Sequence, residues 1–224
     1  MKFTFYPEVQ NIGLTGCYFL MRDLKNKADD ERFAQLKTEA ITATLPELHE
    51  ASIENNPILQ GFRNLHATIG KTSKKYTSSP ENLLRYLLEH KNLPHVNLVV
   101  DIYNLISVKN KLALGAHDTR SIEGDITLRL TTGTENFVPL GYTEVKSVSS
   151  GDYAYVDDAN DILCWLEVRQ VEKTKVTLDT TECFYIVQGN ANTPSDYIKQ
   201  TTYELIALTK EFCGGQEEFL YKPW

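Results

Sequence analysis

Cysteine is scarce in this chain, and the spacing of its few cysteines excludes two common uses of the residue. The 224 residues include four of them, far apart and without a C-x-x-C pair. A structural zinc site usually needs closely spaced ligands, and a disulfide framework is typical of small secreted domains. We therefore predict reduced thiols, no metal, no other cofactor and a cytoplasmic location. The four residues are Cys17, Cys164, Cys183 and Cys213.

Long apolar runs and an excess of basic charge are also missing. No stretch approaches the roughly 20 apolar residues of a membrane-spanning helix. The first residues, 1–8, lack the basic start and apolar run of a secretory signal. The chain has 23 Lys and Arg against 30 Asp and Glu, a formal net charge of −7. This sign disfavours strong non-specific nucleic-acid binding, and we expect neither a membrane nor a DNA partner.

Three familiar catalytic motifs are incomplete. The Gly-Lys-Thr at residues 70–72 lacks the glycine that a P-loop has five residues earlier, where Leu65 stands. His49-Glu50 begins like a zinc-protease helix, but Ile53 replaces the second histidine. No G-x-S-x-G nucleophile elbow is present. These observations exclude P-loop nucleotide binding, HExxH-type zinc chemistry and an elbow-based serine hydrolase.

The hydrophobic pattern is that of an ordinary folded protein, with 42% hydrophobic and 10% aromatic residues. Residues 1–25 have a short-strand pattern broken by glycines. Helical spacing follows from Asp29 or Asp30 to near Glu50, and residues 71–79 are polar and predicted to be a loop. Ser79-Pro80-Glu81 predicts a helix with Ser79 as its N-cap.

The second half of the chain mixes helices and strands. Residues 97–111 favour a helix that places Asp101 and Asn104 one turn apart on a shared face, although a strand over 98–103 also fits. Strands are expected near residues 126–130, 136–140, 153–156, 162–169 and 183–188. A last helix begins at residues 193–196 and stops at Gly214-Gly215.

The segment 117–130 is the strongest local candidate for a site. It contains His117, the carboxylates of Asp118, Glu123 and Asp125, and Gly124, just before an alternating strand. A strand is a rigid base, the polar connection before it is accessible, and carboxylates can orient an imidazole or a water. The alternative is an ordinary polar turn.

An ordered series of motifs resembles one known family. The series runs through Leu93–Asn104, Leu112–Asp118 and Ile122–Asp125, then Val168-Arg169-Gln170 and Thr174. It resembles the B3/B4 editing and tRNA-binding domain of the phenylalanyl-tRNA synthetase β subunit, and more closely the free-standing proteins built from that domain. An ordered series is more specific than any single motif.

The resemblance covers about half of the chain, from about residue 79 to 189, and implies an α+β fold. We expect a largely antiparallel central sheet with helices from both ends of the chain packed against it. The whole chain, 1–224, is then a single B3/B4-like domain. Residues 1–78 supply N-terminal strands and helices, 79–189 the core with the motifs, and 190–224 the C-terminal helix.

One position departs from the synthetase pattern. The family's Asp-x-x-Asn corresponds to Asp101 and Asn104, and its Pro-x-His-Ala-Phe-Asp corresponds to Ala113–Asp118. The editing histidine therefore falls on Gly115, and His117 stands where the synthetase has phenylalanine. Free-standing relatives share this Gly-x-His-Asp form. Two hypotheses follow: His117 has taken over the role, or no side-chain base is used.

The resemblance implies hydrolysis of the ester between a wrong amino acid and the tRNA 3′ end. Such a site positions a water, holds the terminal ribose and recognises the amino-acid side chain. His117 with Asp118 would orient the water, Asn104 and Gln170 would bind the ester carbonyl or ribose hydroxyls, and Arg169 would meet a phosphate or an oxyanion. Further substrate-binding candidates are Tyr103, Lys173, Thr174, Glu123 and Asp125, of which the last two can instead cap the following strand.

The leading hypothesis is a trans-editing hydrolase that deacylates mischarged aminoacyl-tRNA. Weak, salt-sensitive tRNA binding is expected through a local basic strip at Lys71, Lys74 and Lys75. One alternative is a non-catalytic tRNA- or RNA-binding module with a synthetase-like fold. A second is a small-molecule amino-acid ester or amide hydrolase, which suits the acidic charge balance better.

Overall fold

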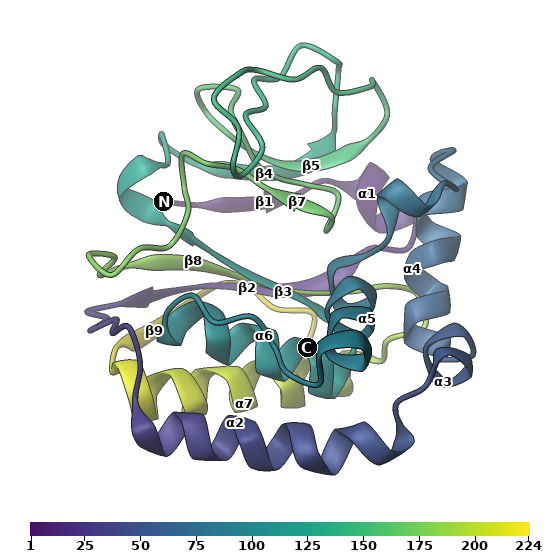
Figure 1. Cartoon of the computed structure of the whole chain (residues 1–224). Helices are drawn as coiled ribbons and strands as arrows, with labels where there is room; N and C mark the ends of the chain where they lie inside the picture. Colours follow the sequence, from purple (N-terminus) through teal and green to yellow (C-terminus); the bar gives the residue numbers. More distant parts are fainter.

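Strands form two sheets, and the longest helices cover one face of the second sheet (Figure 1). The computed structural model describes all residues, 1–224. The strands are β1 (Phe3–Phe5), β2 (Thr15–Arg22), β3 (Ala113–Asp118), β4 (Ile126–Leu130), β5 (Tyr153–Asp157), β6 (Ile162–Trp165), β7 (Arg169–Gln170), β8 (Cys183–Gly189) and β9 (Gln216–Tyr221). The α-helices are α1 (Pro7–Asn11), α2 (Glu31–Thr44), α3 (Glu50–Glu54), α4 (Pro57–Thr68), α5 (Ser79–His90), α6 (Leu98–Asn110) and α7 (Ser195–Cys213). Short 3-10 turns are η1 (Leu45–Glu47), η2 (Lys74–Tyr76) and η3 (Thr119–Ser121).

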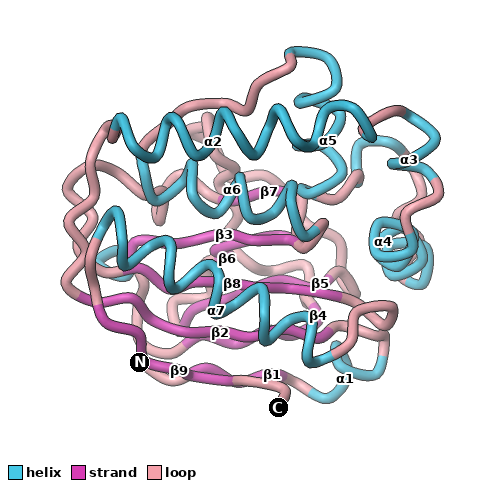
Figure 2. Tube along the Cα trace, turned by 90° about the horizontal axis from the view of Figure 1, so that it is seen from below, coloured by secondary structure: helices cyan, strands magenta, loops and turns pink.

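The first sheet has the strand order β1-β4-β5-β6-β7, and the second has the order β3-β8-β2-β9. All neighbouring strands are antiparallel except the parallel pair β1 and β4. Helices α6 and α7 lie over the second sheet on the side away from the first, and α2 lies beyond them (Figures 1 and 2). The predicted α+β class with largely antiparallel pairing is confirmed, although two stacked sheets replace the single central sheet.

The central strands of the second sheet are buried on both faces because two cores meet there. Along β2, Phe19 and Met21 belong to the core against the helices, and Tyr18 and Leu20 to the core between the sheets. Successive side chains of a strand point to opposite faces. A strand between two apolar layers therefore has no polar face, which explains the continuous apolar run of β2.

Asparagine and aspartate caps set the starts of three helices. Asp30 accepts from backbone amides at the start of α2, Asn56 at the start of α4 and Asn97 at the start of α6. Such caps satisfy amides that have no partner within the helix. The helix expected over residues 97–111 is confirmed. The predicted cap of α5 is wrong by one position, because Ser79 is already helical and Ser78 precedes the helix without a side-chain cap bond.

Several predicted boundaries differ from the structure for local reasons. The helix expected to reach Glu50 ends at Thr44, where a turn containing Pro46 follows, because proline lacks an amide proton and clashes with the preceding turn. The strand expected over 162–169 is broken at Leu166, whose φ is 53°. Residues 136–140 form only isolated bridges at Asn136 and Pro139. Strands β3 and β9 were not predicted.

Candidate functional site

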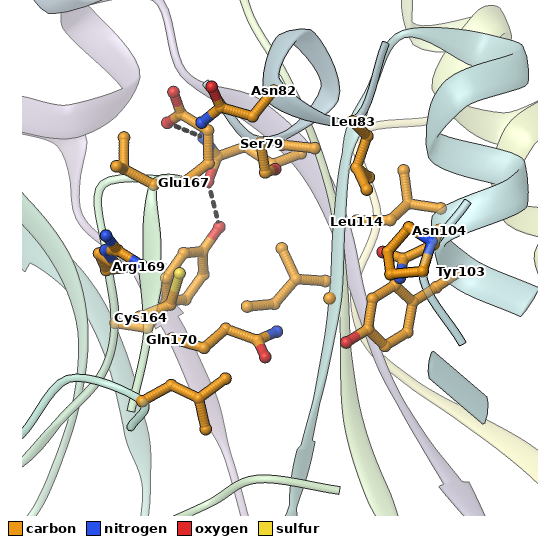
Figure 3. Close-up of a pocket in the computed structure, with 18 of the residues that line it drawn as sticks. Ser79, Asn82, Leu83, Tyr103, Asn104, Leu114, Cys164, Glu167, Arg169 and Gln170 are labelled. Atoms are coloured by element: carbon orange, nitrogen blue, oxygen red, sulfur yellow. Dashed lines mark hydrogen bonds between the residues drawn. The ribbon is translucent and has the colours of Figure 1, made fainter. Parts of the chain in front are cut away.

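A cavity of about 350 Å³ lies where α5 and α6 meet strands of both sheets (Figure 3). Its wall is largely apolar, because leucine, isoleucine, valine and tyrosine side chains from these elements converge there. A concave, mostly apolar site with a few polar groups is the usual form of a small-molecule pocket. The apolar wall includes Leu83, Leu114, Leu140, Val168 and Ile186.

Four of the residues proposed from the sequence line this cavity together. Helix α6 supplies Tyr103 and Asn104, and the short strand β7 supplies Arg169 and Gln170. Figure 3 shows Tyr103 and Asn104 on one side, Arg169 on the other, and Gln170 reaching between them. Burial raises the pKa of the Tyr103 hydroxyl, and a hydrogen bond with Gln170 opposes this shift. The phenol is therefore neutral and available as a hydrogen-bonding group.

Gly115, on β3, also lines the cavity, and its missing side chain makes room for Gln170. A Cβ atom at this position would lie 2.7 Å from Nε2 of Gln170. This is the position onto which the resemblance maps the synthetase's editing histidine. An amide from β7 therefore occupies the space beside the strand that a longer side chain at 115 would need.

His117 lies two residues further along β3 and does not line the cavity. It is 1% exposed, pairs with Phe184 in the sheet, and its Nδ1 is 2.8 Å from Oγ1 of Thr174. Burial lowers the pKa of the imidazole to about 3. The expectation of an accessible histidine on a polar connection is wrong, because His117 belongs to β3, an edge strand that pairs with β8 and whose six residues are all buried.

Asp118 ends the same strand and is used structurally. Its Oδ2 accepts from Nη2 of Arg120 at 2.7 Å and from Oγ1 of Thr180 at 2.6 Å, and its Oδ1 accepts from the backbone amide of Arg120. Burial alone would raise the pKa of this carboxyl, but the hydrogen bonds from Arg120 and Thr180 lower it below its ordinary value. The carboxylate stabilises the turn after β3 and makes no hydrogen bond with His117.

The remaining proposed substrate-binding residues lie away from the cavity, near the turn that joins β5 to β6. Lys173 places Nζ 2.6 Å from Oδ2 of Asp161, and Asp125 accepts from the backbone amide of Lys2 at 2.7 Å. The backbone amide of Glu123 donates to Asp157. Thr174, already described, is buried against His117. The structure does not bring these side chains together with Asn104.

The three lysines proposed to bind RNA have different surroundings. Nζ of Lys71 lies 3.0 Å from Oδ1 of Asp152 and over the ring of Tyr76, and this side chain is 11% exposed. Lys74 and Lys75 are exposed, and Lys75 also lies over the ring of Tyr76. The expected strip is therefore reduced to two solvent-facing lysines, because the third is buried in an ion pair.

A polar network behind the cavity was not predicted from the sequence. Glu167 lines the cavity, and its Oε1 lies 2.6 Å from Nε2 of His66. Its other oxygen, Oε2, accepts hydrogen bonds from Nε2 of Gln188 at 3.0 Å and from the hydroxyl of Tyr153. All four residues are buried. The only sequence signals are a lone acid within an apolar segment and a histidine on a largely apolar helix, and nothing local relates them.

The cysteines and the potential metal ligands do not form a further site. The four cysteines are buried and free, and burial raises the pKa of the Cys164 thiol in the cavity wall, which disfavours a nucleophilic thiolate. No group of three or more His, Cys, Asp or Glu side chains is arranged to hold a metal ion. None of the helices combines the length and apolar character needed to cross a membrane.

Fold and cavity together define an α+β domain of two stacked sheets and a helical layer, with a largely apolar pocket at one end. The chain belongs to the B3/4 domain family, whose model matches residues 61–211. It is 31% identical over 137 residues to the phenylalanine–tRNA ligase β subunit of Mycoplasma genitalium. This match includes 61% of the chain and 16% of that subunit. The resemblance found in the motifs is confirmed.

A solved structure shows the same fold. The crystal structure of an N-terminal fragment of the phenylalanyl-tRNA synthetase β subunit from Pyrococcus horikoshii matches with a TM-score of 0.52 and 15% identity. The match covers 97% of this chain and 50% of that fragment. The chain thus spans half of the fragment and a smaller share of the bacterial subunit.

Proposed function

We propose that this protein hydrolyses the ester of mischarged aminoacyl-tRNA in trans and binds the aminoacyl group in the cavity between the sheets. The observation that supports this most is the convergence of Tyr103, Asn104, Arg169 and Gln170, from segments more than 60 residues apart, in one cavity of about 350 Å³. A largely apolar wall with a few polar groups suits an amino-acid side chain joined to a polar ester.

The polar groups of the cavity suit the parts of such a substrate. The amides of Asn104 and Gln170 can donate to the ester carbonyl and accept from ribose hydroxyls. Arg169 is exposed at one side of the cavity, where it can meet a phosphate or the oxyanion that develops as water attacks. Tyr103 contributes a neutral hydroxyl beside Gln170.

The general base is proposed to come from the substrate. His117 is outside the cavity and buried, and Cys164 retains its proton. The terminal ribose of a charged tRNA has a free hydroxyl beside the ester, and this hydroxyl can orient or activate the attacking water. The protein then contributes mainly positioning and electrostatic stabilisation.

Specific observations favour two other functions. A non-catalytic RNA-binding module is favoured because no histidine lines the cavity. A hydrolase for small amino-acid esters or amides is favoured by the net charge of −7 and by the ion pair that neutralises Lys71. The cytoplasm is the proposed location for all three.

Deacylation assays on a panel of tRNAs charged with non-cognate amino acids test the proposal. We expect release of the amino acid from at least one tRNA, with a loss of roughly 10-fold or more in Asn104→Ala and Gln170→Ala, because positioning groups are removed. Gln35→Ala, on the exposed face of α2, is the matched control. Binding without hydrolysis would favour the module, and equal turnover of free amino-acid esters would favour the small-molecule hydrolase.

A further inference from the structure

A buried histidine and a buried glutamate form an ion pair directly behind the cavity. His66 is 3% exposed and Glu167 is 6% exposed, and Nε2 of the imidazole is 2.6 Å from Oε1 of the carboxylate. The hydroxyl of Tyr153 lies 3.2 Å from the same Nε2 and donates to the carboxylate. Buried charges are costly unless they are paired and hydrogen-bonded, so this cluster requires an explanation.

The pair connects two cavities. Glu167 lines the cavity between the sheets, whereas His66 lines a larger polar cavity between α4 and α5. From Glu167 the hydrogen bonds continue into the wall of the first cavity: Nε2 of Gln188 donates to Oε2, and Oε1 of Gln188 accepts from the hydroxyl of Tyr155 at 2.5 Å. Gln188 and Tyr155 both line that cavity. In Figure 3 this chain begins at Glu167.

We propose that His66 is a positioning residue for the substrate cavity and acts through Glu167. The imidazolium holds the carboxylate, the carboxylate sets the orientation of the Gln188 amide, and the amide holds the Tyr155 hydroxyl. If Glu167 no longer accepted the hydrogen bond from Gln188, the side-chain amide of Gln188 would be free to rotate by 180°. This rotation would exchange the positions of its Nε2 and Oε1 atoms. The assignment of this wall to a substrate rests on the proposed function, whereas the coupling between His66 and Gln188 does not.

The charge of the imidazole depends on groups that face it from three elements. Burial alone would lower the pKa of His66, but the charge and hydrogen bond of Glu167 and the more distant charge of Glu81 raise it above its ordinary value. Tyr153 faces the imidazole from β5. Because the pKa is raised, the imidazolium–carboxylate pair is intact below the ordinary histidine value of about 6.5 and weakens as the pH rises through the folded-state value.

Two cations near this pair are already engaged. Arg63 places Nε 3.0 Å from Oε2 of Glu81, and Lys71 is paired with Asp152, although both cations line the same polar cavity as His66. Neither replaces the imidazolium as the partner of Glu167. The imidazole of His66 is therefore the only cation paired with Glu167, and its proton decides how firmly Glu167 is held.

NMR titration of the full chain tests the coupling without any substrate. In the wild type, we expect the side-chain amide signals of Gln188 to shift with the same midpoint as the imidazole of His66, above pH 6.5. The shared midpoint should vanish in His66→Gln and remain in His95→Gln. His95 is the matched control because it also faces a carboxylate, Asp101, but lies outside the cavity.

Glu167→Gln provides a second variant in case His66→Gln does not fold. Without the carboxylate, burial dominates and the His66 midpoint should fall below pH 6.5. A midpoint that stays above 6.5 in Glu167→Gln, or Gln188 signals that ignore His66 in the wild type, would overturn the proposal.

Kinetics on the charged-tRNA panel link the network to the cavity. We expect KM to rise several-fold with pH across the His66 midpoint, while kcat changes less. In His66→Gln, which retains a neutral donor, we expect KM to be independent of pH in this range. His66→Leu should raise KM at every pH. A pH step in KM that persists in His66→Gln contradicts the positioning role. If no tRNA is deacylated but the NMR coupling is present, the proposed function fails and the positioning of Gln188 stands.

Discussion

Gly115 and Gln170 share one space at the wall of the cavity, since a Cβ atom on the glycine would lie 2.7 Å from Nε2 of the glutamine. Real Cβ contacts are essentially never this short. The atom in the way is the end of a flexible side chain, so the glutamine can move while the strand stays in place.

Gly115→Ala should displace the Gln170 amide and reduce deacylation. We expect a loss of roughly 10-fold, because a misplaced positioning group can cost this much or more, with little change in unfolding free energy. Gln170→Ala and the double variant should show a similar loss, and this non-additivity is the diagnostic result. Rates and urea unfolding are measured for all three variants. Independent, multiplying losses would show that the two positions do not act through one contact.

His117→Ala should destabilise the protein more than it affects the chemistry. Removing the buried imidazole leaves a cavity and an unpaired Thr174 hydroxyl, which should cost roughly 2 kcal/mol or more of unfolding free energy. At a temperature where the variant is folded, kcat should fall by less than a factor of about 10, below the range of general-base catalysis. A loss of about 100-fold in a variant that is as stable as the wild type would restore His117 as the base.

Acid should destabilise the native state through His117. The folded-state pKa of about 3 lies below the ordinary 6.5, so the unfolded chain binds the proton first. The contribution of the neutral His117 to the unfolding free energy is therefore complete above pH 6.5 and decreases as the pH falls. The folded-state pKa of His66 is instead raised above its ordinary value, so this imidazole is already protonated in the native state in this pH range. Urea unfolding between pH 6.5 and 4.5 should show a steeper loss in the wild type than in His117→Asn, and equal slopes would contradict the assignment.

Lys74 and Lys75 should supply the salt-dependent part of tRNA binding, and Lys71 should not. Replacing the first two by alanine should reduce the slope of log affinity against log salt by about 1 to 2, since each phosphate contact contributes about one unit. Lys71→Ala should instead lower stability, because the buried Asp152 loses its only cationic partner and keeps only the hydrogen bond from Trp165. Lys146→Ala, an exposed lysine paired with Glu144, is the control. An unchanged slope would exclude this surface.

All four thiols should titrate after denaturation without reductant, and the purified protein should contain no stoichiometric zinc. In the native state the reaction should be slow, because burial raises the pKa of Cys17 to about 12 and that of Cys213 to about 11. Thiol titration and elemental analysis provide the measurement. Fewer than four thiols would contradict the prediction of reduced cysteines.

Local rules were sufficient to predict helices α2, α5, α6 and α7, although not all of their ends, and to identify the family. Asp30, Asn56 and Asn97 cap helices because their side chains satisfy nearby backbone amides, a relation that depends only on adjacent residues. The ordered motifs identified the family, and among their residues Tyr103 and Gln170 reached the cavity. These positions were predictable because the order of motifs along a chain is preserved when the fold is.

Tertiary structure alone decided which polar residues are accessible. His117 was expected on an accessible polar connection, but residues 113–118 form the edge strand β3, which pairs with β8 and is buried at all six positions. His66 and Glu167 are separated by 100 intervening residues and meet only because α4 packs against the first sheet. Strand pairing and burial depend on distant segments, so neither the loss of His117 as a base nor the ion pair behind the cavity is visible in local sequence.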